Sequence, residues 1–557
     1  MVQITDRDVQ NDPGSDWRQY FGFSTDHKVI GIQYLVTTFF FYLVGGLEAM
    51  IIRAELATPD TNIVEPGTYN GLFTLHATVM IFLWVIPVLA GFGNFLVPLM
   101  IGARDMAFPR LNALSFWIIP PAAVLLLSSY FVPGGPAASG WWAYPPLSLQ
   151  NESGVWYNGQ FIWIVSLIML GTSSILAAIN FVVTIVSMRA PGMELFRMPI
   201  FIWNTLTISF ITLLAGPVLV AALILLGFDL NAGTGFFNPA KGGDPIIYQH
   251  MFWFYSHPAV YIMILPAMGM ISEILPTFAR KPLFGYKVIA LSTLAIAVLG
   301  FSVWVHHMFT SGTPAWMRMF FMITSMIIAV PTGVKVLNWV ATVWGGKLWL
   351  TSAMLFAMGF VGMFVLGGIT GVMLASVPVD IHVSNTYFVV AHLHYVLFGG
   401  SVLGIYAGMY YWFPKITGRM LNEGLGKIHF WTTFVGLNLA FLPMHQVGLL
   451  GMPRRVAQYA PEFATLNLIT SLGAFALGIS TVPFIFNAVY SWFWGPKAGN
   501  NPWGSYGLEW QIASPPPVEN FEHLPVITEG PYEYGRDDAD AERQPALRDP
   551  QSRGGNL

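Results

Sequence analysis

Long apolar segments alternate with short polar ones along this chain of 557 residues. A helix needs roughly 20 apolar residues to cross about 30 Å of hydrocarbon. The pattern predicts twelve transmembrane helices, at 28–52, 74–101, 112–133, 158–187, 200–228, 246–275, 285–308, 317–345, 350–375, 386–414, 427–449 and 464–495. We therefore expect an N-terminal arm (1–27), an all-α membrane domain (28–495) and a polar, extended C-terminal tail (496–557).

Composition supports a polytopic membrane protein and restricts its chemistry. The chain is 55% hydrophobic and only 10% charged, whereas soluble proteins carry about 25% charged residues. The absence of cysteine excludes disulfides, iron–sulfur clusters, c-type haem and thiolate copper centres. Any bound metal must therefore rest on nitrogen or oxygen ligands. The net charge of -3 gives no indication of nucleic-acid binding.

The distribution of basic residues predicts the orientation. An even number of spans places both termini on one side of the membrane. If that side is cytoplasmic, the inner loops carry most of the basic residues, as the positive-inside rule requires: Arg104, Arg110, Arg189, Arg197, Arg280, Lys281, Lys347, Lys415 and Arg419. The outer loops carry mainly Lys241, Arg318, Arg454 and Arg455. We therefore expect cytoplasmic termini and, since the polar start is no signal peptide, no cleaved leader.

Histidines inside the apolar segments are the main candidate functional residues. An ionisable ring in hydrocarbon is costly, so its presence there indicates function, and imidazole is the commonest metal ligand. Six such histidines lie towards the outer ends of their predicted spans: His76, His257, His306, His307, His392 and His394. Their common depth predicts a group of metal sites.

Helical spacing divides these histidines among three sites. His392 and His394 are two residues apart and point to nearly opposite faces of a helix, so they suit two different cofactors. His257 and Tyr261 are four apart and share a face. The economical arrangement places His76 and His394 on one centre, His392 on a second, and His257, His306 and His307 on a third.

Six motifs together resemble subunit I of the haem–copper terminal oxidases. They are H-P-A-V-Y at 257–261, W-V-H-H-M-F-T at 304–310, P-T-G-V-K at 331–335, V-V-A-H-L-H-Y-V at 389–396, G-W-W-A-Y-P-P-L at 140–147 and G-M-P-R-R at 451–455. The match runs in order from about residue 24 to 495, and the tail resembles that of cyanobacterial members. The resemblance implies a twelve-helix bundle that encloses two haems and one copper ion.

The resemblance also assigns the cofactor ligands. His76 and His394 would be the axial ligands of a low-spin haem, and His392 the ligand of a high-spin haem. The other three histidines would hold copper, with Tyr261 covalently linked to His257, and oxygen would be reduced to water between iron and copper. Haem type a is expected, with types o and b left open.

Arginines near the outer ends resemble family residues that contact the haems. Arg454 and Arg455 would pair with the haem propionates, with Trp141 nearby, because guanidinium groups bind carboxylates well. Arg53 resembles the arginine that hydrogen-bonds the formyl group of the low-spin haem. Taken alone, Arg53 is also compatible with a snorkelling residue at a helix end.

Two polar rows resemble the proton paths of the family. Lys335 lies inside a span and, with Thr332, Ser272 and Thr370, matches the lysine path. The aspartate path would begin at Asp105 and continue through Asn94, Asn112, Asn180, Ser173 and Ser174. Ala259 replaces the glutamate that many members have, and Tyr255 and Ser256 resemble a variant whose hydroxyl groups take its place.

A second departure concerns the electron donor. Ser384 and Asn385 stand where the family usually has the His-Asp ligands of a magnesium or manganese ion. Cytochrome c is the expected electron donor, with its electrons passing through subunit II. The alternative is that the enzyme is a quinol oxidase, whose subunit II lacks dinuclear copper. We expect subunits II and III as partners, in a bacterial cytoplasmic or thylakoid membrane. A nitric-oxide reductase fits Tyr261 and Lys335 less well, and a transporter leaves the histidines unexplained.

Overall fold

The computed structural model describes residues 17–151 and 153–534, which are helical with isolated bridging pairs but no strand. The first helices are α1 (His27–Glu55), α2 (Pro66–Val79), α3 (Ile86–Ile101), α4 (Pro109–Trp117), α5 (Ile119–Ser128), α6 (Gly159–Ser187), α7 (Ile200–Asn231), α8 (Pro245–Ala279) and α9 (Tyr286–Gly300). They are followed by α10 (Ala315–Ile327), α11 (Ala329–Val343), α12 (Ser352–Ala375), α13 (Val377–Val383), α14 (Tyr387–Val396), α15 (Leu403–Thr417), α16 (Glu423–Leu449) and α17 (Ala464–Trp494).

Each of the twelve predicted segments coincides with helix, and the all-α membrane fold is confirmed. Ten helical segments are long and apolar enough to cross a membrane. The seventh predicted span falls on α9, which has only 15 residues and is extended by the short helix η7 (Trp304–Met308). The eleventh falls on α16, which has 27 residues but a more polar composition that includes Lys427, His429 and Asn438.

Several spans are interrupted within the membrane, and proline explains two of the breaks. Pro120 and Pro121 lie just after the break between α4 and α5, and Pro331 lies just after the break between α10 and α11. Proline has no N–H to donate to the preceding turn, so the helical ladder loses a bond there.

Two further breaks are π-helical: η2 (Met80–Val85) joins α2 to α3, and η8 (Leu397–Val402) joins α14 to α15. Each begins within four residues of a candidate haem ligand, His76 or His394. Such π-helical turns occur frequently at functional sites.

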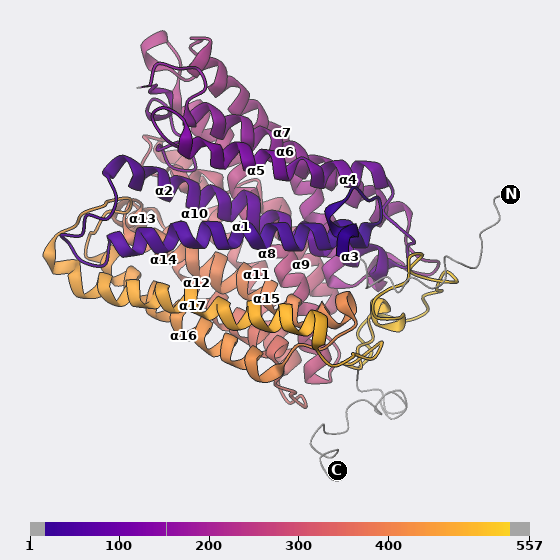
Figure 1. Ribbon diagram of the computed structural model, residues 1–557. Helices are drawn as coiled ribbons and strands as arrows, with labels where there is room; N and C mark the ends of the chain where they lie inside the picture. Colours follow the sequence, from indigo (N-terminus) through magenta and orange to yellow (C-terminus); the bar gives the residue numbers. More distant parts are fainter. Residues whose placement is uncertain (1–16, 152, 535–557) are drawn as a thin grey trace.

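Residues 496–534, called here the tail segment, pack against one end of the bundle (Figure 1). The segment is irregular apart from the short helix η10 (Leu508–Gln511), and its Trp503, Trp510 and Tyr532 are buried. Lys415 anchors it by donating from Nζ to the carbonyl of Ile512 at 2.8 Å. We call this the tail end of the bundle; the opposite end, which carries the six histidines, is the histidine end.

Candidate metal centres

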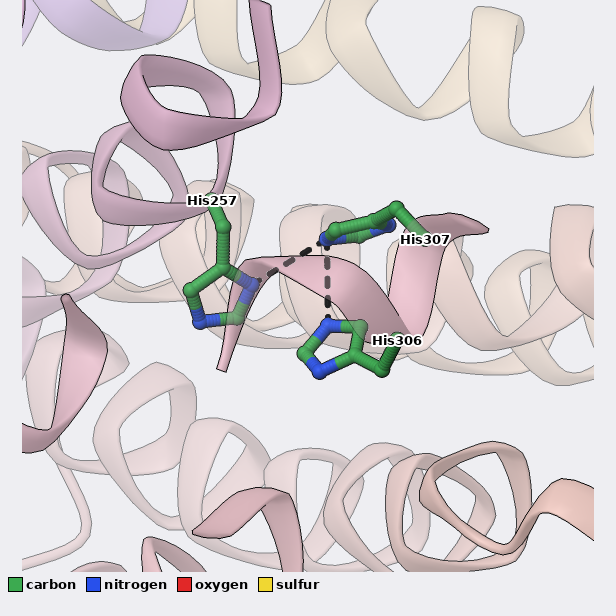
Figure 2. Close-up of side chains that lie close together, drawn as sticks. All are labelled: His257, His306 and His307. Atoms are coloured by element: carbon green, nitrogen blue, oxygen red, sulfur yellow. Dashed lines mark hydrogen bonds between the residues drawn. The ribbon is translucent and has the colours of Figure 1, made fainter. Parts of the chain in front are cut away.

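Three imidazoles from two elements converge at the histidine end. His257 lies on α8, and His306 and His307 lie on η7 (Figure 2). The Nε2 atom of His307 is 3.1 Å from both His257 Nδ1 and His306 Nε2. Three nitrogens bound at about 2 Å to one ion are separated by about 3.3 Å in tetrahedral geometry. The three rings therefore fit a shared metal ion.

Neighbouring groups fix the orientation of these rings. The Nδ1 atom of His306 is 2.8 Å from the hydroxyl oxygen of Ser325, which leaves Nε2 directed at the cluster. The indole of Trp253 stacks on the ring of His307, with centroids 3.8 Å apart. Trp253 also hydrogen-bonds the hydroxyl of Tyr144. Ligand rings that are oriented by outer partners are typical of metal sites.

Tyr261 lies beside the same cluster. Its ring centroid is 4.9 Å from that of His257, and the two rings meet edge to face. His257 directs Nδ1 at the metal position, so Nε2 is its free nitrogen. That Nε2 is buried and has no hydrogen-bond partner among the described residues. An unpaired buried polar atom is costly, and here it lies next to the phenol ring.

His76 and His394 form a second potential ligand pair. Their rings are nearly parallel, with an angle of 10° and centroids 6.3 Å apart. Two metal–nitrogen bonds of about 2 Å and the radii of two imidazole rings account for this separation. His76 Nδ1 is 2.8 Å from the carbonyl of Gly45, and His394 Nδ1 is 2.8 Å from that of Val390. Because carbonyls only accept, Nδ1 carries the proton in both rings and Nε2 is free to bind a metal.

His392 is oriented in the same way but points to a different site. Its Nδ1 is 3.0 Å from the carbonyl of Gly367 and 3.1 Å from the hydroxyl of Thr370, so Nε2 is again available. A Cβ atom at Gly371 would lie 2.9 Å from its ring, so the glycine leaves the room that this ring needs. His392 also interacts electrostatically with His306, which places it beside the three-histidine cluster.

Arg454 and Arg455 lie together against one tryptophan, and neither forms an ion pair among the described residues, although Asp380 acts electrostatically on Arg454. Both stack on Trp142, with guanidinium carbons 4.5 Å and 3.7 Å from its ring centroid. Burial lowers the pKa of Arg454 to about 10 and that of Arg455 to about 9. No carboxylate forms an ion pair with either group within 17–151 or 153–534. Both side chains are half-buried, and a cation withdrawn from water is costly unless it is paired, so the site fits an anionic group such as a haem propionate.

Trp141, expected near these arginines, is adjacent in sequence to Trp142, on which both guanidinium groups stack. Trp141 packs against Phe252 and Trp253, with ring centroids 5.3 Å and 5.7 Å away, whereas its neighbour Trp142 contacts the guanidinium groups. Arg53 is buried on α1 and donates from one terminal nitrogen to Asn467 and Ser471. Its other terminal nitrogen has no partner among the described residues, which leaves a donor for a ligand.

The residues of the expected lysine path are only partly in contact. Lys335 is fully buried, and its Nζ donates to the hydroxyl of Thr293 at 2.8 Å. Ser272 instead accepts from Trp339 Nε1 at 2.9 Å. The hydroxyl of Thr332 donates to the carbonyl of Ile328 within its own helix region. Thr370 contacts His392, not Lys335, as described above.

Asp105 is half-buried at the tail end, between α3 and α4. Burial raises the pKa of its carboxyl to about 6, although Met106 N donates to it at 2.7 Å. Asn180 accepts from Phe108 N at 2.9 Å and so holds the loop that carries Asp105.

Buried polar atoms without partners mark the rest of the expected aspartate path. Among the described residues, Oδ1 of Asn94 and both side-chain polar atoms of Asn112 are buried and unpaired, as is the hydroxyl of Ser256. Ser173 and Ser174 line a cavity between the helices. Tyr255 is buried beside Ser256. Buried water commonly satisfies such groups, so these positions suit a water-filled row.

Sequence reasoning missed Trp142, Trp253, Ser325 and Thr293. Trp253 could have been found, because it lies four residues before His257 on one helix and therefore on the same face. The direct stacking of Trp142 on the two arginines depends on a loop conformation that two adjacent identical residues do not reveal. Ser325 and Thr293 reach their partners from other helices, so no local spacing indicates them.

The bundle and its histidines define a multi-pass membrane protein with one three-histidine group that could hold a metal ion and with further inward histidines whose Nε2 atoms are free. Residues 29–476 match the family described as cytochrome c and quinol oxidase polypeptide I. The chain is 60% identical over 527 residues to cytochrome c oxidase subunit 1 of Synechocystis sp., covering 95% of each chain. It is 60% identical over 520 residues to the protein of the same name from Thermostichus vulcanus, covering 93% of each.

The chain therefore belongs to the cytochrome c and quinol oxidase polypeptide I family. Its fold also resembles that of a solved haem–copper terminal oxidase dimer, with a TM-score of 0.72 over 85% of each chain and 18% sequence identity. Membership implies haem and copper cofactors, which agrees with the three groups of histidines described above.

Proposed function

We propose that this chain is the catalytic subunit of a terminal oxidase that reduces oxygen to water and translocates protons. One observation carries the proposal: the three groups of histidines adjoin one another. The three-histidine cluster interacts with His392, and His392 is two residues before His394, whose ring faces that of His76. In this order His76 and His394 would hold one haem, His392 a second haem, and the three-histidine cluster a copper ion next to it. The haems and copper, when bound, supply the redox chemistry.

The protein supplies the ligands in a fixed tautomer. His76 and His394 hold the low-spin haem, and His392 holds the high-spin haem, each through Nε2. His306 and His307 hold copper through Nε2. The third copper ligand, His257, binds through its other nitrogen, Nδ1. A three-nitrogen copper site leaves a position open for oxygen, as a catalytic centre requires.

Tyr261 supplies a proton and an electron from its phenol group. The unpaired Nε2 of His257 and the 4.9 Å ring separation support a covalent link between these two side chains. Such a link would remove the unsatisfied nitrogen and hold the phenol at the site where oxygen is reduced.

The arginines orient the haems. Arg454 and Arg455 bind propionates, because both are half-buried without an ion-pair partner in the described part of the chain. The free terminal nitrogen of Arg53 donates to a polar substituent of the low-spin haem, such as a formyl group of haem a. Trp141 packs beside Trp253 and supports the ring stacked on His307.

Protons reach the site from the tail end by two rows. Lys335 supplies one row with Thr332 on the same helix and Ser272 on α8, and Thr370 orients His392 at its far end. The other row begins at Asp105 and passes Asn180, Asn94 and Asn112 to Tyr255 and Ser256. The unpaired amides and hydroxyl along this row bind water, and that water conducts protons past Ala259 without the glutamate that many family members have at this position.

Cytochrome c, acting through a partner subunit, is the electron donor that the similarity favours. The relatives described above are named cytochrome c oxidase subunit 1. The quinol alternative rests on Asn385, whose carbonyl and side-chain oxygens accept from Arg454 at 3.0 Å and 3.3 Å. The guanidinium of Arg454 therefore binds Asn385, which stands where the family usually has a metal ligand.

Subunits II and III complete the enzyme in a bacterial cytoplasmic or thylakoid membrane, with both termini in the cytoplasm. The test is oxygen uptake by the purified complex with reduced cytochrome c and with quinol in parallel. We expect uptake with cytochrome c together with the absorption of two haems. Uptake with quinol alone would establish the alternative donor, and a preparation without haem absorption would refute the function.

A further inference from the structure

A buried carboxyl group at the tail end has no role in the scheme above. Glu273 lies on α8, one residue after Ser272, and is only 6% exposed. Its Oε1 accepts from the hydroxyl of Tyr532 at 2.5 Å and from Phe201 N at 3.1 Å. The same hydroxyl accepts from Ile200 N at 2.8 Å. The tail segment thus places a phenol on a membrane-embedded acid, where a carboxyl group is costly and indicates function.

The contacts of Lys335 lead towards this acid and away from Ser272. The Ser272 hydroxyl is already occupied, because it donates to the Met268 carbonyl and accepts from Trp339, both at 2.9 Å. Lys335 Nζ donates to Thr293 on α9, and Thr293 donates to Asn204 Oδ1 on α7 at 2.8 Å. The three side chains are fully buried.

Asn204 lies one helical turn from Glu273. It is three residues after Phe201, whose N–H binds the carboxyl, and its Nδ2 is 2.9 Å from the Cβ position at Gly269, one turn before Glu273 on α8. One turn of helix is about 5.4 Å, a distance that one water molecule spans with two hydrogen bonds. Asn204 Nδ2 is buried and has no partner among the described residues, so it is a free donor for such a water.

We propose that Glu273 supplies the proton that Lys335 carries, through water that the Asn204 amide holds in place and through the hydroxyl of Thr293. The carboxyl group gives up a proton, neutral Lys335 takes one up, and solvent at the tail end restores the proton of Glu273. Tyr532 holds the carboxyl oxygen at the start of this row. The inference rests on the proposed function, since it assumes that Lys335 delivers protons to the oxygen-reducing site.

The test compares variants of the whole purified oxidase. The rate of reduction of the high-spin haem is measured without oxygen in the wild type and in Glu273→Gln, Thr293→Val and Lys335→Met. We expect Glu273→Gln and Thr293→Val to slow reduction about tenfold, less than Lys335→Met, because water partly replaces a lost proton carrier. Glu273→Asp should restore part of the rate. Glu423→Gln is the matched control, since it alters a half-buried carboxyl bound to Ser352 outside this row.

Infrared difference spectra provide a readout that a purely structural role would not change. Reduction should shift a carboxyl band that disappears in Glu273→Gln and moves in Tyr532→Phe, while the haem spectra of both variants stay unchanged. Wild-type rates in Glu273→Gln and Thr293→Val, with Lys335→Met slow, would overturn the route alone. Wild-type rates in all three variants would also remove Lys335 from the proposed function.

Discussion

At the histidine end, one nitrogen of an imidazole ring is left free because the other nitrogen of the same ring is bound to a backbone carbonyl. In His76, for example, Nδ1 is bound to the carbonyl of Gly45 and Nε2 is free. At the tail end, carboxyl groups are themselves the paired groups: Glu273 accepts from Tyr532, and Asp105 accepts from Met106. The first arrangement fixes a tautomer and holds a metal in one geometry. The second leaves groups that can gain and lose a proton.

This difference shows how one helix serves both needs. α8 carries His257 near its first third and Glu273 near its last turns, so metal binding and proton supply are joined by a single rigid element. Substitutions at the histidine end should therefore remove chemistry, whereas those at the tail end should slow it.

The largest effect is expected from His306→Ala. Even loss of an outer partner of a ligand costs about 10–100-fold in metal affinity or activity, so loss of a ligand should lower oxygen reduction more than about 100-fold. The low-spin haem spectrum should remain, because His76 and His394 are untouched. Oxygen uptake and visible absorption measure the two properties, and sustained turnover would refute the copper assignment.

At the tail end, Lys335→Met should slow reduction of the high-spin haem by roughly 100-fold, the lower range for a positioned proton-transfer group. Methionine fills similar space but carries no proton. Stopped-flow spectroscopy without oxygen measures the rate, and Lys427→Met provides a control on a different helix. Unchanged kinetics would remove Lys335 from the proton path.

Ser325→Ala tests whether outer partners matter at the histidine end. It removes the hydroxyl that is 2.8 Å from His306 Nδ1, and we expect about tenfold weaker copper binding. Copper retained after dialysis against a chelator measures this affinity. Retention equal to that of the wild type would mean that Trp253 and packing suffice to orient the cluster.

Asp105→Asn tests the proton-exchanging character of the tail end through stability. Because burial raises the pKa of Asp105 from 3.8 to about 6, its contribution to folding is favourable below pH 4 and is lost as the pH rises through 6. The variant should therefore gain thermal stability relative to the wild type at pH 8 but not at pH 4. A Tm difference that is the same at both pH values would contradict the raised pKa.

The smallest effect is expected where the tail segment contacts the bundle. Asn520 accepts from Lys28 Nζ at 2.9 Å and donates to the carbonyls of Ala103 and Arg104 at 3.0 Å. Asn520→Ala should lower the free energy of unfolding by about 2 kcal/mol, the scale of a hydrogen bond to a charged group. Thermal unfolding measures this, with the exposed Glu519→Ala as control. Equal Tm values for Asn520→Ala and the wild type would show that these hydrogen bonds of the tail segment do not stabilise the fold.

The sequence predicted much of the fold because apolar length and helical spacing are local properties. All twelve spans coincide with helix, and the rule that residues two apart face opposite ways separated His392 from His394. The partners of Lys335 were not predictable, since Thr293 is 42 residues away and Asn204 lies on yet another helix. Composition also suggested a polar tail, but its buried tryptophans and tyrosines contact surfaces that form only after the helices pack.

The central claim is that His257, His306 and His307 bind copper beside a high-spin haem. Metal analysis of the purified complex, normalised to this chain and compared with its haem content, tests it most directly. We predict iron equal to the haem content, with two haems per chain, and one copper bound by this chain that His306→Ala loses. Iron in excess of haem, with no copper lost in His306→Ala, would contradict the account.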